Sequence, residues 1–280
     1  MICCIGFRFL DRAATITTAE EKFLDTPNPW KLCTVTQVEE LKILARMLPV
    51  FLAAMIFNTA EALFPLFIEQ GQVMDNHIHS FSIPPASLTT FNCLCIVILA
   101  PAYNKVLMPI ASRITGVKRG LSELQRIGVG MAFAVLSLVS AAIVEMARLD
   151  MAKKTGLVHQ STAVPMNILW QAPQYILVGV AKVFSVVGFI EFAYEQSPDA
   201  MRSCCQACAL VMVSLGSYLV SVMLKMIDSV TEGIWGHGWI PENLNQGRLD
   251  LFFWLMAGLQ LLNLLGFAYC AMRYKNKLAG

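Results

Sequence analysis

Apolar residues fall into six long runs separated by short polar segments. The runs cover residues 43–68, 86–110, 124–145, 166–194, 204–227 and 249–272. A hydrocarbon layer about 30 Å thick requires roughly 20 helical residues, and every run reaches that length. The pattern therefore predicts six membrane-spanning helices with no soluble domain between them.

The segment before the first run, residues 1–42, is the most polar long part of the chain. Within it, Thr36 and Glu39 have the spacing of a capping box. This spacing predicts an amphipathic helix that begins there and leads into the first span. We expect residues 1–42 to be a cytosolic segment and residues 43–280 to form the transmembrane domain.

The composition agrees with this class. Hydrophobic residues make up 56% of the chain, charged residues only 14%, and the mean hydropathy is +0.60, whereas an average soluble domain is about 25% charged. The net charge of +2 is too small to indicate binding to nucleic acid. The fold class is therefore an all-α integral membrane protein, with the lipid bilayer as its first partner.

The basic residues predict the orientation. An even number of spans places both termini on one side, and fifteen of the 21 Lys and Arg residues fall on that side. The opposite loops hold four: Arg148, Lys153, Lys154 and Arg248. Because Lys and Arg concentrate in cytoplasmic loops, both termini are expected to be cytosolic.

Signatures of catalysis and of metal binding are missing from the sequence. It has no HExxH, no GxSxG and no phosphate-binding loop ending in Gly-Lys-Ser/Thr. His77 and His79 alone make an incomplete metal site. Most of the nine cysteines lie in or beside apolar runs, where we expect them to act as small apolar residues. The sequence therefore predicts neither an enzyme nor a cofactor.

Two charged residues lie inside the predicted spans. Lys182 stands near the middle of the fourth run and Glu61 within the first, with Asn58 on the same helical face as Glu61 and Tyr175 in a stripe with Lys182. A charge at membrane depth is costly and usually faces a partner or a cavity. Glu61 and Lys182 form either a structural ion pair or part of a solute pathway, in which Lys182 holds an anionic group and Glu61 accepts a proton or a cation. We favour the pathway.

Several motifs carry a family resemblance: NPWKLCTVTQVEELK, IPPASL, GLSELQRIG, PQYILVGVAKVF, EQSPDAMRS and GWIPENLNQGRLDLFFW. In this order they resemble the plant proton-coupled oligopeptide and nitrate transporters of the major facilitator superfamily, and most of all the di- and tripeptide transporters. The resemblance implies a fold of twelve spans in two six-helix halves with the substrate site between them. It covers only the second half.

The resemblance also implies a function. We expect a proton-coupled secondary transporter of small solutes, with protons and a small-molecule substrate as ligands, present as a half that does not transport alone. The alternative is a truncated, non-transporting membrane protein that associates with full-length relatives. The plasma membrane is the expected location, with the vacuolar membrane as the alternative.

The chain departs from the family pattern at three places. Lys182 stands where the family has a Glu that pairs with a fourth-helix Lys and, in peptide carriers, holds the substrate amine. Around Glu61 the family usually has Tyr or His followed by Ala-Gln. Tyr103, Asn104 and Lys105 stand where the family has Tyr-Asp-Arg, so the charge-locking role of that Asp is not carried over. We predict that Glu61 and Lys182 form a relocated ion pair, and that Lys182 favours an anion or carboxylate over an amine.

Overall fold

The computed structural model describes residues 34–78, 81–103, 105, 108–115, 122–160, 162–198, 201–235, 238–241 and 243–274. Its helices are α1 (Val35–Glu61), α2 (Phe64–Gln72), η3 (Pro85–Leu88), α3 (Thr89–Ala102), α4 (Met108–Thr115), α5 (Glu123–Lys154), η5 (Ile168–Gln171), α6 (Ala172–Gln196), α7 (Arg202–Trp235) and α8 (Leu249–Arg273). The strands are β1 (Met74–Asp75), β2 (His77–Ile78), β3 (Phe81–Ser82) and β4 (Val164–Asn167). Residues 1–33, including most of the predicted cytosolic segment, and Asn104 lie outside the described part.

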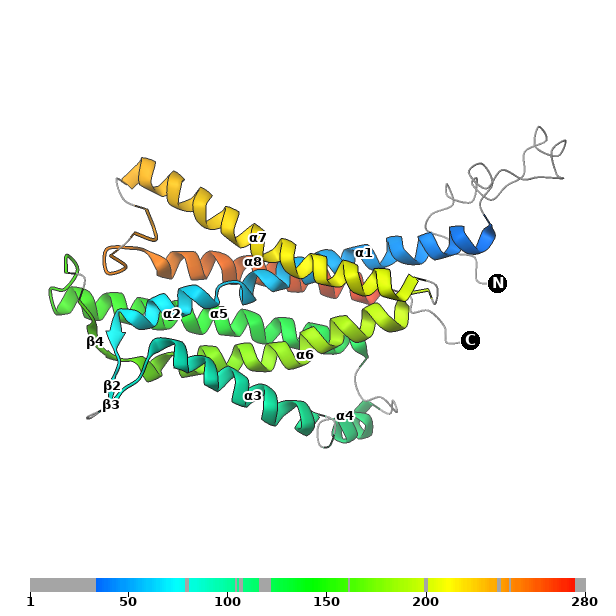
Figure 1. Ribbon diagram of the computed structural model, residues 1–280, viewed down its shortest axis with the longest axis horizontal. Coiled ribbons are helices and arrows are strands. Elements are labelled where there is room, and N and C mark those ends of the chain that lie inside the picture. The colour runs from blue at the N-terminus through cyan, green and yellow to red at the C-terminus, as the bar shows by residue number, and fades with distance from the viewer. Residues whose placement is uncertain are drawn as a thin grey trace.

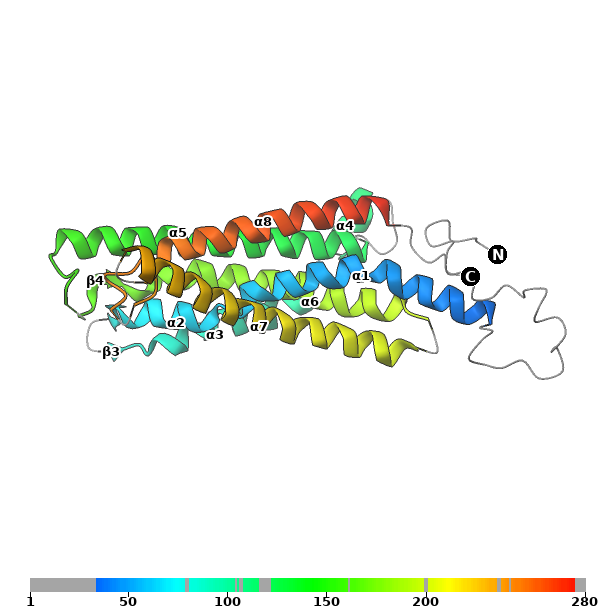
Figure 2. The ribbon, with the colours of Figure 1, turned by 90° about the horizontal axis from the view of Figure 1, so that it is seen from above.

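The long helices run along one common axis and form an elongated bundle (Figures 1 and 2). Within the described residues, six helical segments are long and apolar enough to cross a membrane, α1 and α2 together counting as one. The start of α1 and the end of α8 lie at the same end of the bundle, as an even number of spans requires. The short strands lie at the opposite end, where β1 pairs with β4 and β2 with β3.

Helix α5 lies at the centre of the packing. It contacts α6 and α8 extensively, while α1 packs against α7 and α8 and α3 packs against α6. At the α5–α6 contact, a Cβ on Gly130 would lie 2.8 Å from the Ala181 carbonyl oxygen and would overlap Ser185. The missing side chain therefore lets two helix backbones approach closely, a common device in membrane bundles.

The first helix begins earlier than the sequence predicts. The capping box is made by Thr34 and Gln37, not by Thr36 and Glu39: the Thr34 hydroxyl accepts from the Gln37 amide, and the Gln37 side chain accepts from the Thr34 amide. Both spacings fit the capping pattern, and the earlier one gives a longer helix. The amphipathic lead-in and the first span are accordingly one continuous helix.

A break divides the first predicted span. Helix α1 ends at Glu61, a turn follows, and α2 begins at Phe64 with Pro65 in its first turn. Because a proline ring clashes with the carbonyl four residues earlier and has no N–H, Pro65 prevents the helix from continuing through Glu61. The break therefore places an acidic side chain at a helix end inside the membrane.

Other helix ends also differ from the predicted spans. Helix α3 ends as an α-helix at Ala102 and is followed by π-helical backbone at Tyr103 and Lys105, α5 continues past Glu145 to Lys154, and α7 continues to Trp235. The fourth run begins at Met166 with strand and 3₁₀ backbone, and α6 proper starts only at Ala172. Hydropathy detects the apolar core of a helix and is insensitive to polar turns that extend it beyond the hydrocarbon.

Helices α3 and α7 are less covered than the others. In the most apolar stretch of each, 11% of residues are buried, against 39–56% in the other four spans. Their exposed side chains include Val97 and Ile98 on α3 and Leu210, Tyr218 and Met226 on α7. Both helices thus leave broad apolar faces uncovered.

Candidate functional site

Glu61 and Lys182 meet in the structure, which confirms the predicted ion pair. Lys182 Nζ lies 3.6 Å from Glu61 Oε2, and the two side chains are 28% and 24% exposed. Glu61 is the last residue of α1, and Lys182 stands near the middle of α6. The pair therefore joins a helix break to the neighbouring span and keeps an opening toward the outside of the bundle.

Aromatic rings complete the surroundings of Lys182. Its Nζ lies 5.0 Å from the centroid of the Phe64 ring, within the range of a cation–π contact. Tyr175 packs edge-on against Phe64 and Phe67 at centroid distances of 5.6 and 5.8 Å. Tyr175 is fully buried, and its hydroxyl has no hydrogen-bond partner among the described residues. Tyr175 thus positions Phe64, and Phe64 contacts Lys182.

Asn58 does not join the pair. Its side-chain amide donates to the Ala54 carbonyl at 2.7 Å, and a Cβ built on Gly216 of α7 would lie 2.9 Å from the Asn58 Cβ. Asn58 therefore faces α7 and bonds to its own helix.

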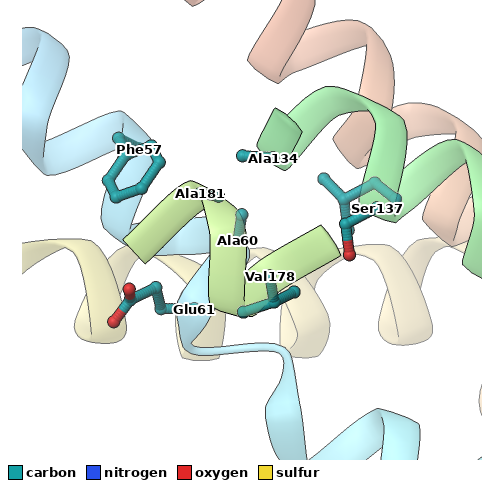
Figure 3. A pocket seen from close by; sticks show the side chains of 8 residues that line it. Phe57, Ala60, Glu61, Ala134, Ser137, Val178 and Ala181 are labelled. Carbon is teal, nitrogen blue, oxygen red and sulfur yellow. The ribbon is translucent and has the colours of Figure 1, made fainter. Parts of the chain in front are cut away.

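A small cavity lies beside Glu61, between α1, α5 and α6. Phe57, Ser137, Val178 and Ala181 are among its lining residues (Figure 3). About 10 Å³ is available to the centre of a water molecule, which is close to the least that holds one water. The interior behind Glu61 is therefore nearly closed, and access to the pair comes from its exposed side.

A second charged pair, missed by the sequence analysis, lies near the end of α5. Arg148 and Glu145 are both fully buried, with Arg148 Nε 2.9 Å from Glu145 Oε2. Arg148 also donates to Asn245 Oδ1 and, at 3.0 Å, to the Leu244 carbonyl. The sequence placed Arg148 in an outer loop; this prediction is wrong, because α5 continues through Arg148 and the segment before α8 covers it.

Three buried glutamines extend this network. Gln70 of α2 donates to Glu145 at 2.9 Å and accepts from Gln171 at 2.9 Å and from Gln174 at 3.2 Å. The network thus ties α2, α5, the start of α6 and the loop before α8 together at one end of the bundle. The polar side chains of this network are at most 3% exposed, so we assign it to structure rather than to ligand binding.

Tyr103 lies at the other end of the bundle, in a cluster with Arg126 and Glu191. The Arg126 guanidinium stacks 4.3 Å from the Tyr103 ring and donates to Glu191 at 2.7 Å. Lys105 is exposed, and Asn104 lies outside the described residues. This cluster links the end of α3 to α5 and α6.

No metal centre is visible among the described residues, where no group of three or more His, Cys, Asp or Glu side chains is arranged to hold an ion. His79 lies outside the described part of the chain. Cys205 and Cys208 have Cys-x-x-Cys spacing, yet both are free, with Cys205 buried and Cys208 exposed.

The arrangement of the six spans resembles that of a known transporter structure. A known crystal structure of an auto-inhibited POT family peptide transporter aligns with 87% of this chain at a TM-score of 0.66 and 22% identity, and the alignment covers 44% of that transporter. The six spans are thus arranged as one six-helix half of a major facilitator fold.

The family follows from sequence. Residues 6–240 match the family model PTR2, described as the POT family, and the chain belongs to that family of transporters. It is 47% identical over 273 residues to the Arabidopsis thaliana protein NRT1/PTR FAMILY 8.3 and 44% identical over 275 residues to NRT1/PTR FAMILY 8.5 of the same species. These alignments cover 97% and 98% of this chain but 47% and 45% of the relatives. The chain thus spans slightly less than half the length of the relatives it matches.

Proposed function

We propose that this chain forms the C-terminal half of a proton-coupled secondary transporter of small solutes. The observation that carries the proposal is the Glu61–Lys182 pair, which is charged, partly exposed and located inside the spans. A purely structural pair is favoured by full burial and full hydrogen bonding, as at Glu145 and Arg148, whereas ionisable side chains along a pathway must remain accessible. Peptides and nitrate are the substrate classes that the resemblance implies.

The proposed site requires a second wall. In the described structure, Glu61 and Lys182 are open on one side, and α3 and α7 present apolar faces. A six-helix N-terminal half, or the corresponding half of a full-length relative, would cover these surfaces and enclose the site. We expect no proton-driven uptake by the 280-residue chain alone.

Transport in proteoliposomes tests this proposal. The chain is reconstituted alone and together with the six-helix N-terminal half of NRT1/PTR FAMILY 8.3, and uptake of labelled nitrate and labelled dialanine is driven by an inward proton gradient. Gradient-dependent uptake of either solute is expected only with both halves. Equal uptake by the chain alone would refute the need for a second half, and no uptake with both halves assembled would refute the transport function.

A second candidate function is that of a non-transporting partner. The uncovered faces of α3 and α7 favour association with another membrane protein. Co-purification of the chain with a full-length relative, with no uptake in the two-half assay, would favour this candidate over transport.

The proposed topology has both termini in the cytosol, and the plasma membrane is the proposed location. Its support is the fifteen-to-four distribution of Lys and Arg across the two sides. Epitope tags at each terminus that stain only after permeabilisation of intact cells would support this orientation, and microscopy of the same cells distinguishes the plasma membrane from the vacuolar membrane.

A further inference from the structure

The Lys182 ammonium has room for another ligand. An ammonium carries three N–H donors, and the Glu61 oxygen at 3.6 Å is farther away than the 2.7–2.9 Å typical of a strong charge-assisted hydrogen bond. Its other described neighbour, the Phe64 ring at 5.0 Å, offers no lone pair. With 28% of its side chain exposed, Lys182 can reach an anion that enters from the open side.

The Glu61 carboxylate also has few hydrogen-bond partners among the described residues. Its Oε1 is buried without a hydrogen-bond partner among the described residues, and only Oε2 faces Lys182. An ionised carboxylate accepts about four hydrogen bonds, so the ionised form of Glu61 depends almost entirely on one long contact. Uptake of a proton removes this charge and leaves Lys182 as the uncompensated cation.

Charge balance then couples the two events. The resting pair, with Glu61 ionised and Lys182 protonated, has no net charge. If Glu61 binds one proton and Lys182 binds one monovalent anion, the site again has no net charge, and no bond other than the O–H bond of Glu61 is formed. A proton alone leaves a charge of +1 and an anion alone a charge of −1, and both are costly at membrane depth.

We propose that Lys182 is the binding site for a small monovalent oxyanion, nitrate or a substrate carboxylate, which takes the place of Glu61 as that residue takes up a proton. The biological role of this exchange rests on the transport function proposed above, but the exchange itself lies within this chain. The reversed charge at Lys182 excludes an amine from the same position, and the charge balance excludes a divalent anion such as sulfate.

Calorimetry on the purified 280-residue chain in lipid nanodiscs tests the proposal. Nitrate, N-acetylalanine and sulfate are titrated at several pH values in two buffers that differ in ionisation enthalpy. Nitrate or N-acetylalanine is expected to bind with uptake of about one proton per anion, with affinity falling about tenfold per pH unit once Glu61 is ionised; the stronger of the two identifies the source of the oxyanion. No binding of either, or equal binding of sulfate, would overturn the proposal.

Variants separate the two roles. Glu61→Gln is expected to bind the anion with no proton uptake and with an affinity independent of pH, and Lys182→Arg to keep binding with proton uptake. Lys182→Met is expected to bind at least tenfold more weakly. Lys225→Met is the matched control, because Lys225 is exposed on α7, and it should behave as the wild type.

Loss of anion binding in Glu61→Gln, or proton uptake by that variant equal to that of the wild type, would refute the exchange of the anion for Glu61. If Lys182→Met does not fold, the neutral double variant Glu61→Gln with Lys182→Met is measured instead, and anion binding by it at wild-type affinity would refute the role of Lys182. Proton-driven uptake by the two assembled halves that is unaffected by Lys182→Met would refute this inference alone, whereas proton-linked binding without any uptake would refute only the transport function.

Discussion

At the scale of single residues, the Glu145–Arg148 and Glu61–Lys182 ion pairs differ in how well their charges are satisfied. Arg148 and Glu145 are fully buried and bonded to several neighbours, whereas Glu61 and Lys182 share one contact of 3.6 Å and remain partly exposed. The first arrangement fixes helices, and the second leaves charges free to change partners.

A charge exchange tests the coupling of Glu61 with Lys182. Lys182→Glu alone brings two acids together and is expected to lower the free energy of unfolding by about 1–3 kcal/mol, while adding Glu61→Lys should restore about half of the loss. Denaturant unfolding of the chain in detergent, followed by tryptophan fluorescence, measures each member of the double-mutant cycle. Simple additivity of the two single changes would contradict the pairing.

Arg148→Met is expected to be more harmful. It leaves the Glu145 carboxylate buried without its cation, which costs about 3–5 kcal/mol, and the double variant with Glu145→Gln should recover much of that loss. Lys154→Met is the matched control: Lys154 pairs with Asp150 on the same helix, but the two are 69% and 61% exposed, and such pairs contribute only about 0–1 kcal/mol. Equal unfolding free energies for the two methionine variants would refute the assignment.

Part of the site was predictable from single residues because a charge within an apolar run stands out in the sequence. Glu61 and Lys182 were found in this way. Arg148 was not found, because it lies just beyond the end of an apolar run. Its partner Asn245 is 97 residues away along the chain, and Gln70, which bonds to Glu145, is 75 residues from that residue, so folding alone brings them together. Asn58 shares a helical face with Glu61 by its spacing, but its side-chain amide donates to the Ala54 carbonyl of its own preceding turn.

At the scale of elements, helix contacts depend on where side chains are missing. Gly130 of α5 lies against α6, so Gly130→Ala is expected to push the two helices apart and lower the unfolding temperature by several degrees. Gly258 of α8 has no atom within 4 Å of a built Cβ, and Gly258→Ala should be neutral or slightly stabilising because Ala favours helix. Thermal unfolding of both variants in the same detergent makes the comparison, and a reversed order would contradict the described α5–α6 contact.

The elements themselves were largely predictable, since each apolar run is long enough to require a helix in lipid. The ends were not, because capping, prolines and polar turns decide them. Pro65 follows a helix end that the sequence indicates only in part. Its presence predicts a distortion near Glu61, but whether the span kinks or ends there depends on the packing of α2 against its neighbours.

At the scale of the whole molecule, the described spans are arranged as one six-helix half of a major facilitator fold. The chain aligns with slightly less than half of the length of each of these relatives. Of its six described spans, those of α3 and α7 are the least buried. The site at Lys182 is therefore expected to work as one wall of a central pathway whose other wall comes from a second six-helix unit.

The exchange at Lys182 is tested most directly by the ratio of protons to anions that the assembled halves transport. In proteoliposomes that hold this chain and the N-terminal half of NRT1/PTR FAMILY 8.3, an internal pH dye and labelled nitrate or N-acetylalanine are followed together. If the anion replaces Glu61 at Lys182, at least one proton moves with each anion in the wild type, anion uptake is lost in Lys182→Met, and Lys225→Met is unaffected. Anion uptake that continues undiminished in Lys182→Met, or that proceeds without proton movement, would contradict the exchange.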